Sequence, residues 1–138
     1  PADMLVMAVH KMNAVIVDVR FSTRSRDFQW NGTTLMKGLG ESHYVWLKEL
    51  GNVNYKNEGP IEFQDLKAGM ARLAEILERN PTILLCGCWK RSMCHRLVIA
   101  KRFEISYGQG SMELTVKDIE AMNAAPFDPV EAQGSLFE

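Results

Sequence analysis

The pattern of apolar and polar residues along the chain predicts helices and strands in alternation. In residues 1–12 the apolar positions have the spacing of an amphipathic helix: Leu5, Ala8, Val9 and Met12. Residues 14–19 follow as a β-branched run that is apolar on both parities, as in a strand covered on both faces. We expect two further strands at residues 43–47 and 82–86.

Three more helices are expected between and after these strands. The shortest covers residues 33–39. The clearest apolar stripe covers residues 66–77, where Asp65 stands in position to cap the first turn. Ser92 can cap a third helix, which carries Met93, Leu97 and Ala100 on one face.

The order of these elements predicts the fold class. Strands that alternate with helices form a mainly parallel sheet, so we expect a single Rossmann-like, three-layer α/β domain. A last short strand is expected at residues 112–116. The domain would cover residues 1–123, and residues 124–138, with two prolines and one glycine, would form a mobile C-terminal tail.

Length and composition fit one globular domain. The chain has 138 residues, of which 46% are hydrophobic and 24% charged. The formal net charge of -1 excludes a histone-like polycation but leaves room for a local basic site. No apolar run is long enough to span a bilayer, so no membrane partner is expected. The three cysteines cluster too closely for a disulfide framework, which predicts a reduced, cytoplasmic protein.

Basic residues concentrate in the two loops that follow the first and third predicted strands. Ligands of open α/β sheets bind beyond the C-terminal ends of the strands, where these loops lie. Six of the sixteen basic residues stand there: Arg20, Arg24, Arg26, Lys90, Arg91 and Arg96. Guanidinium groups match phosphate and carboxylate geometry, so a focused anion site is expected. Aromatic residues interleave with them, as in proteins that hold unpaired bases: Phe21, Phe28, Trp30 and Trp89.

The helix that Ser92 caps would add to this site. Cys94, His95 and Arg96 would occupy its first turn, where unpaired N–H groups and the helix dipole favour an anion. The same field would lower the pKa of an exposed Cys94. The alternative is structural: the arginines pair with acidic residues and the cysteines are small core residues.

Three residues are candidates for proton transfer or nucleophilic attack. Asp18, at the end of a buried strand, is either a general base or an anchor for a neighbouring loop or arginine. His95 is the second proton-transfer candidate. Cys94 or Cys88 would be the nucleophile of a thiol enzyme, although Cys88 and Arg96 stand too far apart for the usual C-x5-R loop. The spacing of the cysteines does not favour zinc, and neither a metal nor another cofactor is predicted.

Two motifs resemble a known bacterial family. Asp18-Val19-Arg20 is followed by Ser25-Arg26, and Leu84-Leu85-Cys86 is followed by Cys94-His95-Arg96. On these marks the chain resembles the family catalogued as domain of unknown function 488, over roughly residues 14–116. The resemblance implies a compact Rossmann-like α/β domain. It also implies that eight residues occupy signature positions: Asp18, Arg20, Ser25, Arg26, Cys86, Cys94, His95 and Arg96.

The last residues of the chain carry a second resemblance. Gln133, Leu136 and Phe137 are similar to the Gln-x-x-Leu-Phe peptide with which bacterial replication and repair proteins dock on the sliding clamp. Such a partner would place the protein at DNA. The alternative is that Leu136 and Phe137 pack back on the domain.

The sequence therefore predicts a protein that binds a phosphate-bearing ligand, nucleic acid or nucleotide, at the strand ends. Arg20, Arg24, Ser25, Arg26, Cys86, Lys90, Arg91 and Arg96 would line the site. Whether catalysis follows is left open. The alternative function is a thiol-dependent sulfur- or phosphoryl-transfer enzyme that uses Cys94 or Cys88.

Overall fold

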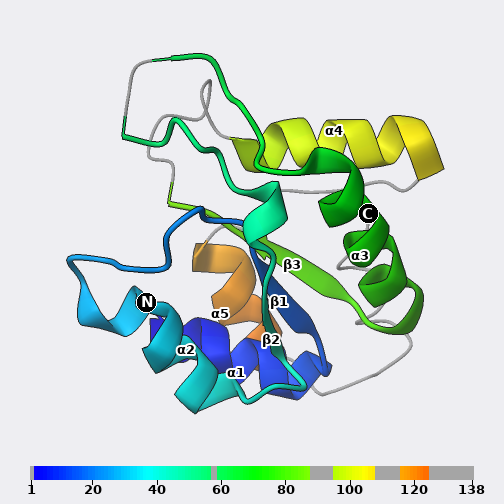
Figure 1. The fold of residues 1–138 in the computed structure, drawn as a ribbon. Helices are drawn as coiled ribbons and strands as arrows, with labels where there is room; N and C mark the ends of the chain where they lie inside the picture. The colour runs from blue at the N-terminus through cyan, green and yellow to red at the C-terminus, as the bar shows by residue number, and fades with distance from the viewer. Residues whose placement is uncertain (1, 57–58, 88–94, 108–115, 125–138) are drawn as a thin grey trace.

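A parallel β-sheet with helices on both faces forms the fold of the computed structural model (Figure 1). The structure describes four stretches of the chain: residues 2–56, 59–87, 95–107 and 116–124. The expected α/β class is confirmed. Within these stretches, none of the helices has the length and apolar character needed to cross a bilayer.

Among the described residues the sheet has three strands, and all of them point the same way. β1 (Val15–Asp18) lies in the centre, with β2 (Tyr44–Trp46) on one side and β3 (Thr82–Leu85) on the other. Asp18, the last residue of β1, stands opposite Trp46 in one neighbour and Leu85 in the other. The C-terminal ends of the three strands therefore form one edge, as expected for a site of this fold class.

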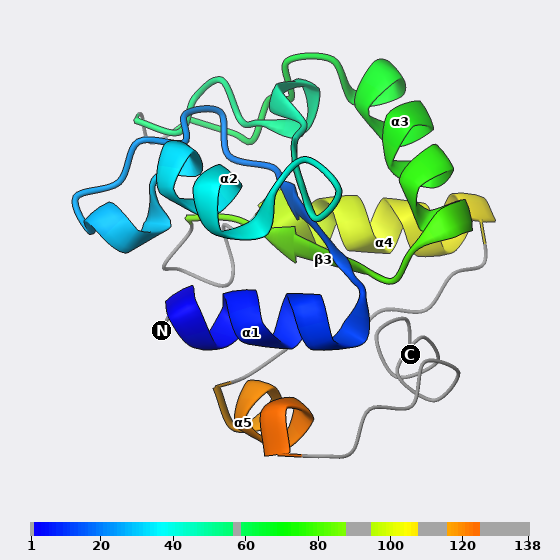
Figure 2. The same cartoon turned by 90° about the horizontal axis from the view of Figure 1, so that it is seen from below.

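Helices cover both faces of the sheet and make three layers (Figure 2). On one face lie α1 (Ala2–Met12) and α2 (Gly32–Leu39). On the other face lie α3 (Leu66–Arg79) and α4 (His95–Tyr107). The fifth helix, α5 (Val116–Ala124), packs against the outer side of α1.

Successive side chains of β1 divide between two hydrophobic clusters, because side chains alternate across a strand. Ile16 packs with α1 and α2. Val15 and Val17 pack with α3 and α4. All four residues of β1 are buried, which explains why its sequence is apolar on both parities.

The first helix ends where the sequence favours an end. Asn13 has a φ of 51°, the left-handed conformation that Asn tolerates better than most residues. The Asn13 N–H donates to the His10 carbonyl, and the Ala14 N–H donates to the Val9 carbonyl at 3.0 Å. This Schellman closure satisfies the last carbonyls of α1 and sends the chain directly into β1.

Two short 3-10 turns and one close backbone contact order the loops at the strand ends. The first turn, η1 (Phe28–Trp30), lies inside the expected loop after β1, and the second, η2 (Lys48–Leu50), follows β2. Gly51 follows η2, and a Cβ there would lie 2.6 Å from the Phe21 Cα. Only glycine lets these two loops pack so closely.

The observed elements confirm most of the expected ones and correct one. Asp65 caps α3, and its side chain accepts from the Ala68 N–H as predicted. The prediction of a strand at residues 112–116 is wrong at Val116, because Val116 begins the helix α5, which was not predicted. The other residues of that expected strand, the capping role of Ser92 and nearly all of the proposed tail lie outside the described residues.

Candidate functional site

Asp18 and Arg20 form a largely buried ion pair at the end of β1. Asp18 is completely buried, and the Arg20 side chain is 11% exposed. The pair is bidentate: Arg20 Nε donates to Oδ1 at 2.8 Å, and Nη2 donates to Oδ2 at 2.6 Å. The Arg20 backbone N–H adds a bond to Oδ1 at 3.2 Å. The carboxylate therefore fixes the guanidinium in one orientation.

Tyr44 completes the contacts of this carboxylate from the neighbouring strand. Its hydroxyl donates to Asp18 Oδ2 at 2.6 Å. Burial raises the pKa of Tyr44, and the bond to Asp18 raises it further. Burial lowers the pKa of Arg20, but the bonds and charge of Asp18 outweigh it, so the net pKa is raised. Each carboxylate oxygen now accepts two bonds, so the geometry supports the anchoring role of Asp18 over that of a general base.

His95 joins the first turn of α4 to the end of β1. It is buried, and its Nε2 lies 2.6 Å from the Val19 carbonyl oxygen. A carbonyl only accepts, so Nε2 carries the proton. Burial lowers the pKa of His95 and the nearby charge of Arg96 lowers it too, while the bond to Val19 and the charge of Asp18 act in the other direction. Arg96 follows in the same turn and is half-buried.

The loop after β1 presents two arginines to solvent. Arg24 and Arg26 are exposed, and neither forms an ion pair with the residues that the structure describes. Ser25 between them is half-buried: its N–H donates to Asn31 Oδ1, and its hydroxyl accepts from the Asp27 N–H at 3.2 Å. The loop is thus tied to itself, and both guanidinium groups stay at its surface.

The remaining predicted site residues either pack against a hydrophobic cluster or lie outside the described part of the chain. Cys86 is half-buried and packs against the cluster on the α3 and α4 face, in agreement with its reading as a small core residue. Lys90, Arg91, Cys88 and Cys94 lie outside the described residues, as does the clamp-like segment with Gln133, Leu136 and Phe137. The thiol-enzyme alternative therefore stays a prediction. In the described part of the chain, no group of three or more His, Cys, Asp or Glu could hold a metal.

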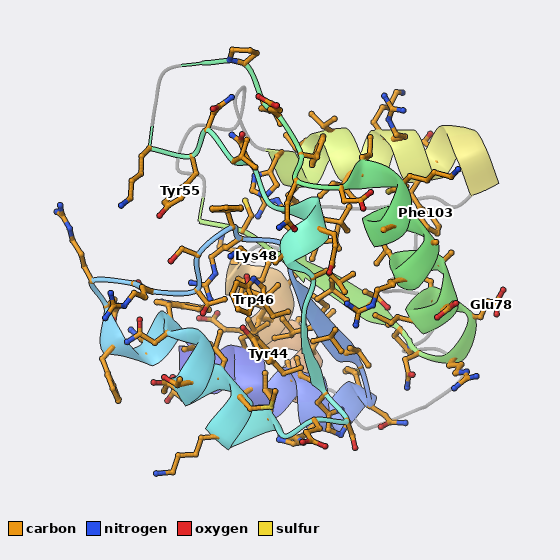
Figure 3. All side chains as sticks on the ribbon, viewed as in Figure 1. Tyr44, Trp46, Lys48, Tyr55, Glu78 and Phe103 are labelled. Carbon is orange, nitrogen blue, oxygen red and sulfur yellow. The ribbon has the colours of Figure 1, made fainter. Side chains whose placement is uncertain are left out.

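Sequence reasoning missed four residues at this edge: Tyr44, Trp46, Lys48 and Tyr55. Figure 3 labels them on β2, on η2 and in the loop after η2. Tyr44 and Trp46 have the two-residue spacing of one strand face, and they stand on a strand that was expected at residues 43–47. That spacing was the available signal, because parallel strands bring their C-terminal ends together.

The assembled edge gathers three arginines of the β1 loop around one ordered ion pair. Arg20 is held in place by Asp18, its Nη1 is not used by the carboxylate, and Arg24 and Arg26 follow within the same loop. Fixed guanidinium groups bind phosphate or carboxylate oxygens with good geometry.

Comparison with known proteins identifies the family alone. No curated protein and no solved structure matches the chain. One family model matches residues 6–103, which is more than half of the 138 residues and includes both β1 with its loop and the first turn of α4. The chain therefore belongs to the family described as Domain of unknown function DUF488.

Proposed function

We propose that the C-terminal edge of the sheet binds a phosphate-bearing ligand, either nucleic acid or a nucleotide. The observation that carries the proposal is the Arg20 guanidinium, fixed by two bonds to Asp18, with exposed Arg24 and Arg26 in the loop that follows. A guanidinium that is already ordered loses little conformational entropy when a phosphate binds.

The first turn of α4 supports the same proposal. The bond between His95 and the Val19 carbonyl brings this turn to the end of β1, and Arg96 stands in it. The helix dipole favours negative charge near the N-terminal end of a helix. Arg96 and this helix start would then contact the same phosphate-bearing ligand as the β1 loop.

Asp18 and His95 act as positioning residues in this proposal. Asp18 orients Arg20, and His95 holds α4 against β1. Neither residue needs to exchange a proton with the ligand. Substitution of either one would therefore weaken binding through displaced arginines and would also lower stability.

Fluorescence anisotropy with a labelled single-stranded oligonucleotide, titrated with salt, tests the proposal. Arg24→Ala and Arg26→Ala should each weaken binding and reduce the salt slope by about 1, because each removes one phosphate contact. Arg96→Ala should cause a larger loss of affinity. The same series with labelled duplex and with a mononucleotide as competitor separates polymer from nucleotide.

Arg79→Ala is the matched control. Arg79 is also an exposed arginine, but it is the last residue of α3 and precedes β3, so it lies at the opposite edge of the sheet. Its loss removes the same charge and should leave affinity and salt slope unchanged. Equal losses in Arg79→Ala and Arg24→Ala would show that binding follows net charge alone and would refute a site at the strand ends.

The C-terminal segment gives the proposal a second part. Gln133, Leu136 and Phe137 would dock the chain on the sliding clamp and bring the strand-end site to DNA. Deletion of residues 133–138 should abolish capture by immobilised clamp and leave oligonucleotide affinity unchanged. Capture that persists after the deletion would contradict this part alone.

A further inference from the structure

Aromatic rings and lysines, all of them exposed or half-buried, lie side by side next to the proposed phosphate site. We name this set the aromatic–lysine surface: Phe21, Trp46, Lys48, Tyr55 and Lys56. The Lys48 Nζ lies 4.7 Å from the centre of the Phe21 ring and 5.6 Å from that of the Trp46 ring. The Phe21 and Tyr55 rings are 5.7 Å apart, and Lys56 Nζ lies 5.6 Å from the Tyr55 ring. Figure 3 shows Lys48 between Trp46 and the loop that carries Tyr55.

Backbone contacts hold this surface against the Asp18–Arg20 pair. The Trp46 indole N–H donates to the Arg20 carbonyl at 2.7 Å, which fixes the plane of the indole. Phe21 directly follows Arg20, and its backbone packs against Gly51. The rings and the guanidinium therefore belong to one continuous edge of the sheet.

The loop that carries Tyr55 is closed by its own hydrogen bonds. Asn52 Oδ1 accepts from the N–H groups of Asn54 and Glu62, and the Val53 N–H donates to the Glu62 carbonyl at 2.8 Å. Asn54 Nδ2 also donates to the Pro60 carbonyl at 3.1 Å. These bonds order the backbone on which Tyr55 stands.

Two of the three rings, those of Trp46 and Tyr55, are open to solvent, so core packing does not account for them. Trp46 is 40% exposed and Tyr55 is 49% exposed. Flat aromatic faces accept a nucleobase by stacking, and every base has such a face. The ammonium groups of Lys48 and Lys56 lie over these rings, and their flexible side chains can turn toward the phosphates on either side of a stacked base. A base inside a duplex has no open face and cannot stack in this way.

We propose that the aromatic–lysine surface binds an unpaired base of a single-stranded nucleic acid by stacking on Trp46 and Tyr55. The inference rests on the proposed function, because the neighbouring arginines supply the phosphate contacts that bring the strand to the rings. It narrows the proposed ligand from any phosphate-bearing molecule to a single-stranded nucleic acid. DNA and RNA share the chemistry of the stacked base, and parallel titrations with both distinguish the two sources.

Anisotropy with two labelled oligonucleotides of equal length and charge tests the inference. One carries bases throughout, and the other has several adjacent abasic positions. The folded protein should bind the intact strand about tenfold more tightly at equal salt, since stacking of one base contributes of that order. Duplex of the same sequence should bind more weakly than the single strand.

Ring substitutions with matched controls locate the effect. Trp46→Leu and Tyr55→Leu should bind both oligonucleotides with the lower affinity of the abasic strand. Trp46→Phe loses the same indole N–H as Trp46→Leu but keeps a ring, and Tyr55→Phe keeps its ring, so both should retain most of the preference for bases. Thermal unfolding of each variant confirms that it is folded.

The outcomes separate this inference from the proposed function. Equal binding of intact and abasic strands, with affinity still lost in Arg24→Ala, would overturn the stacking inference and leave the phosphate site standing. Absence of binding to every oligonucleotide would overturn both. A preference for bases that survives Trp46→Leu and Tyr55→Leu would place the stacking elsewhere and refute the surface named above.

Discussion

The Tyr44 hydroxyl donates to Asp18 Oδ2 at 2.6 Å and joins the end of β1 to the strand beside it. The same oxygen accepts from Arg20 Nη2, so one buried atom connects a phenol and a guanidinium. Tyr44 thereby fixes the carboxylate that in turn fixes Arg20. The orientation of the proposed phosphate ligand thus depends on a residue that is itself buried.

Tyr44→Phe tests this connection. Loss of a hydrogen bond to a charged group should lower the free energy of unfolding by about 2 kcal/mol at neutral pH. The folded protein keeps the phenol protonated because its pKa is raised, whereas the unfolded chain releases the proton near pH 10. Wild-type stability should therefore fall as pH rises above about 10, and the difference from Tyr44→Phe should shrink. Urea titrations of both proteins at pH 8 and above pH 10 measure the difference in their unfolding free energies. A difference that does not change with pH would contradict the raised pKa of Tyr44.

Asp18→Asn should be the more damaging change. It leaves the guanidinium of Arg20, which is only 11% exposed, without its counter-charge, and loss of one partner of a buried pair costs about 3–5 kcal/mol. Adding Arg20→Met removes the stranded charge, so the double variant should recover part of this loss. Urea unfolding of the wild type, both single variants and the double variant gives the coupling energy. Additive losses would show that the pair is not coupled.

Much of the fold could be predicted because its signals are local. The stripe of α1, the Asp65 cap of α3 and the apolar run of β1 each follow from the spacing of residues within one turn or one strand. The Asp18–Arg20 pair was among the alternatives for the same reason, since the two residues are only two positions apart.

The missed part of the site depends on contacts between distant segments. Trp46 lies next to Arg20 only because β2 pairs with β1, and Tyr55 reaches Phe21 only because Gly51 allows two loops to pack closely. Spacing within one segment carries no information on such pairs. Helix α5 was missed for a related reason: it is short, and the apolar residues that it packs against α1 form no long stripe.

The lowered pKa of His95 predicts that the protein loses stability in mild acid. Its folded pKa lies below the ordinary value near 6.5, so at pH values below about 6.5 the unfolded chain takes up a proton that the folded chain does not. The contribution of His95 to folding stability is therefore fully present above about pH 6.5 and decreases as the pH falls below that value. In His95→Gln the side chain does not titrate, and its amide can still donate to the Val19 carbonyl. Urea titrations between pH 7.5 and 5 should give a steeper decline for the wild type; parallel curves would contradict the lowered pKa.

Gly51→Ala should disturb the aromatic–lysine surface as well as the fold. The new Cβ would lie 2.6 Å from the Phe21 Cα, a backbone atom that cannot rotate away, so the two loops must separate. We expect a loss of about 1–3 kcal/mol in unfolding free energy, as for overpacked sites, and a reduced preference for intact over abasic strands. Gly38→Ala is the control, because its Cβ meets nothing closer than 3.7 Å and alanine favours the helix by up to about 1 kcal/mol. If both variants gain stability and keep the preference, Gly51 does not hold the loop of Phe21 in place.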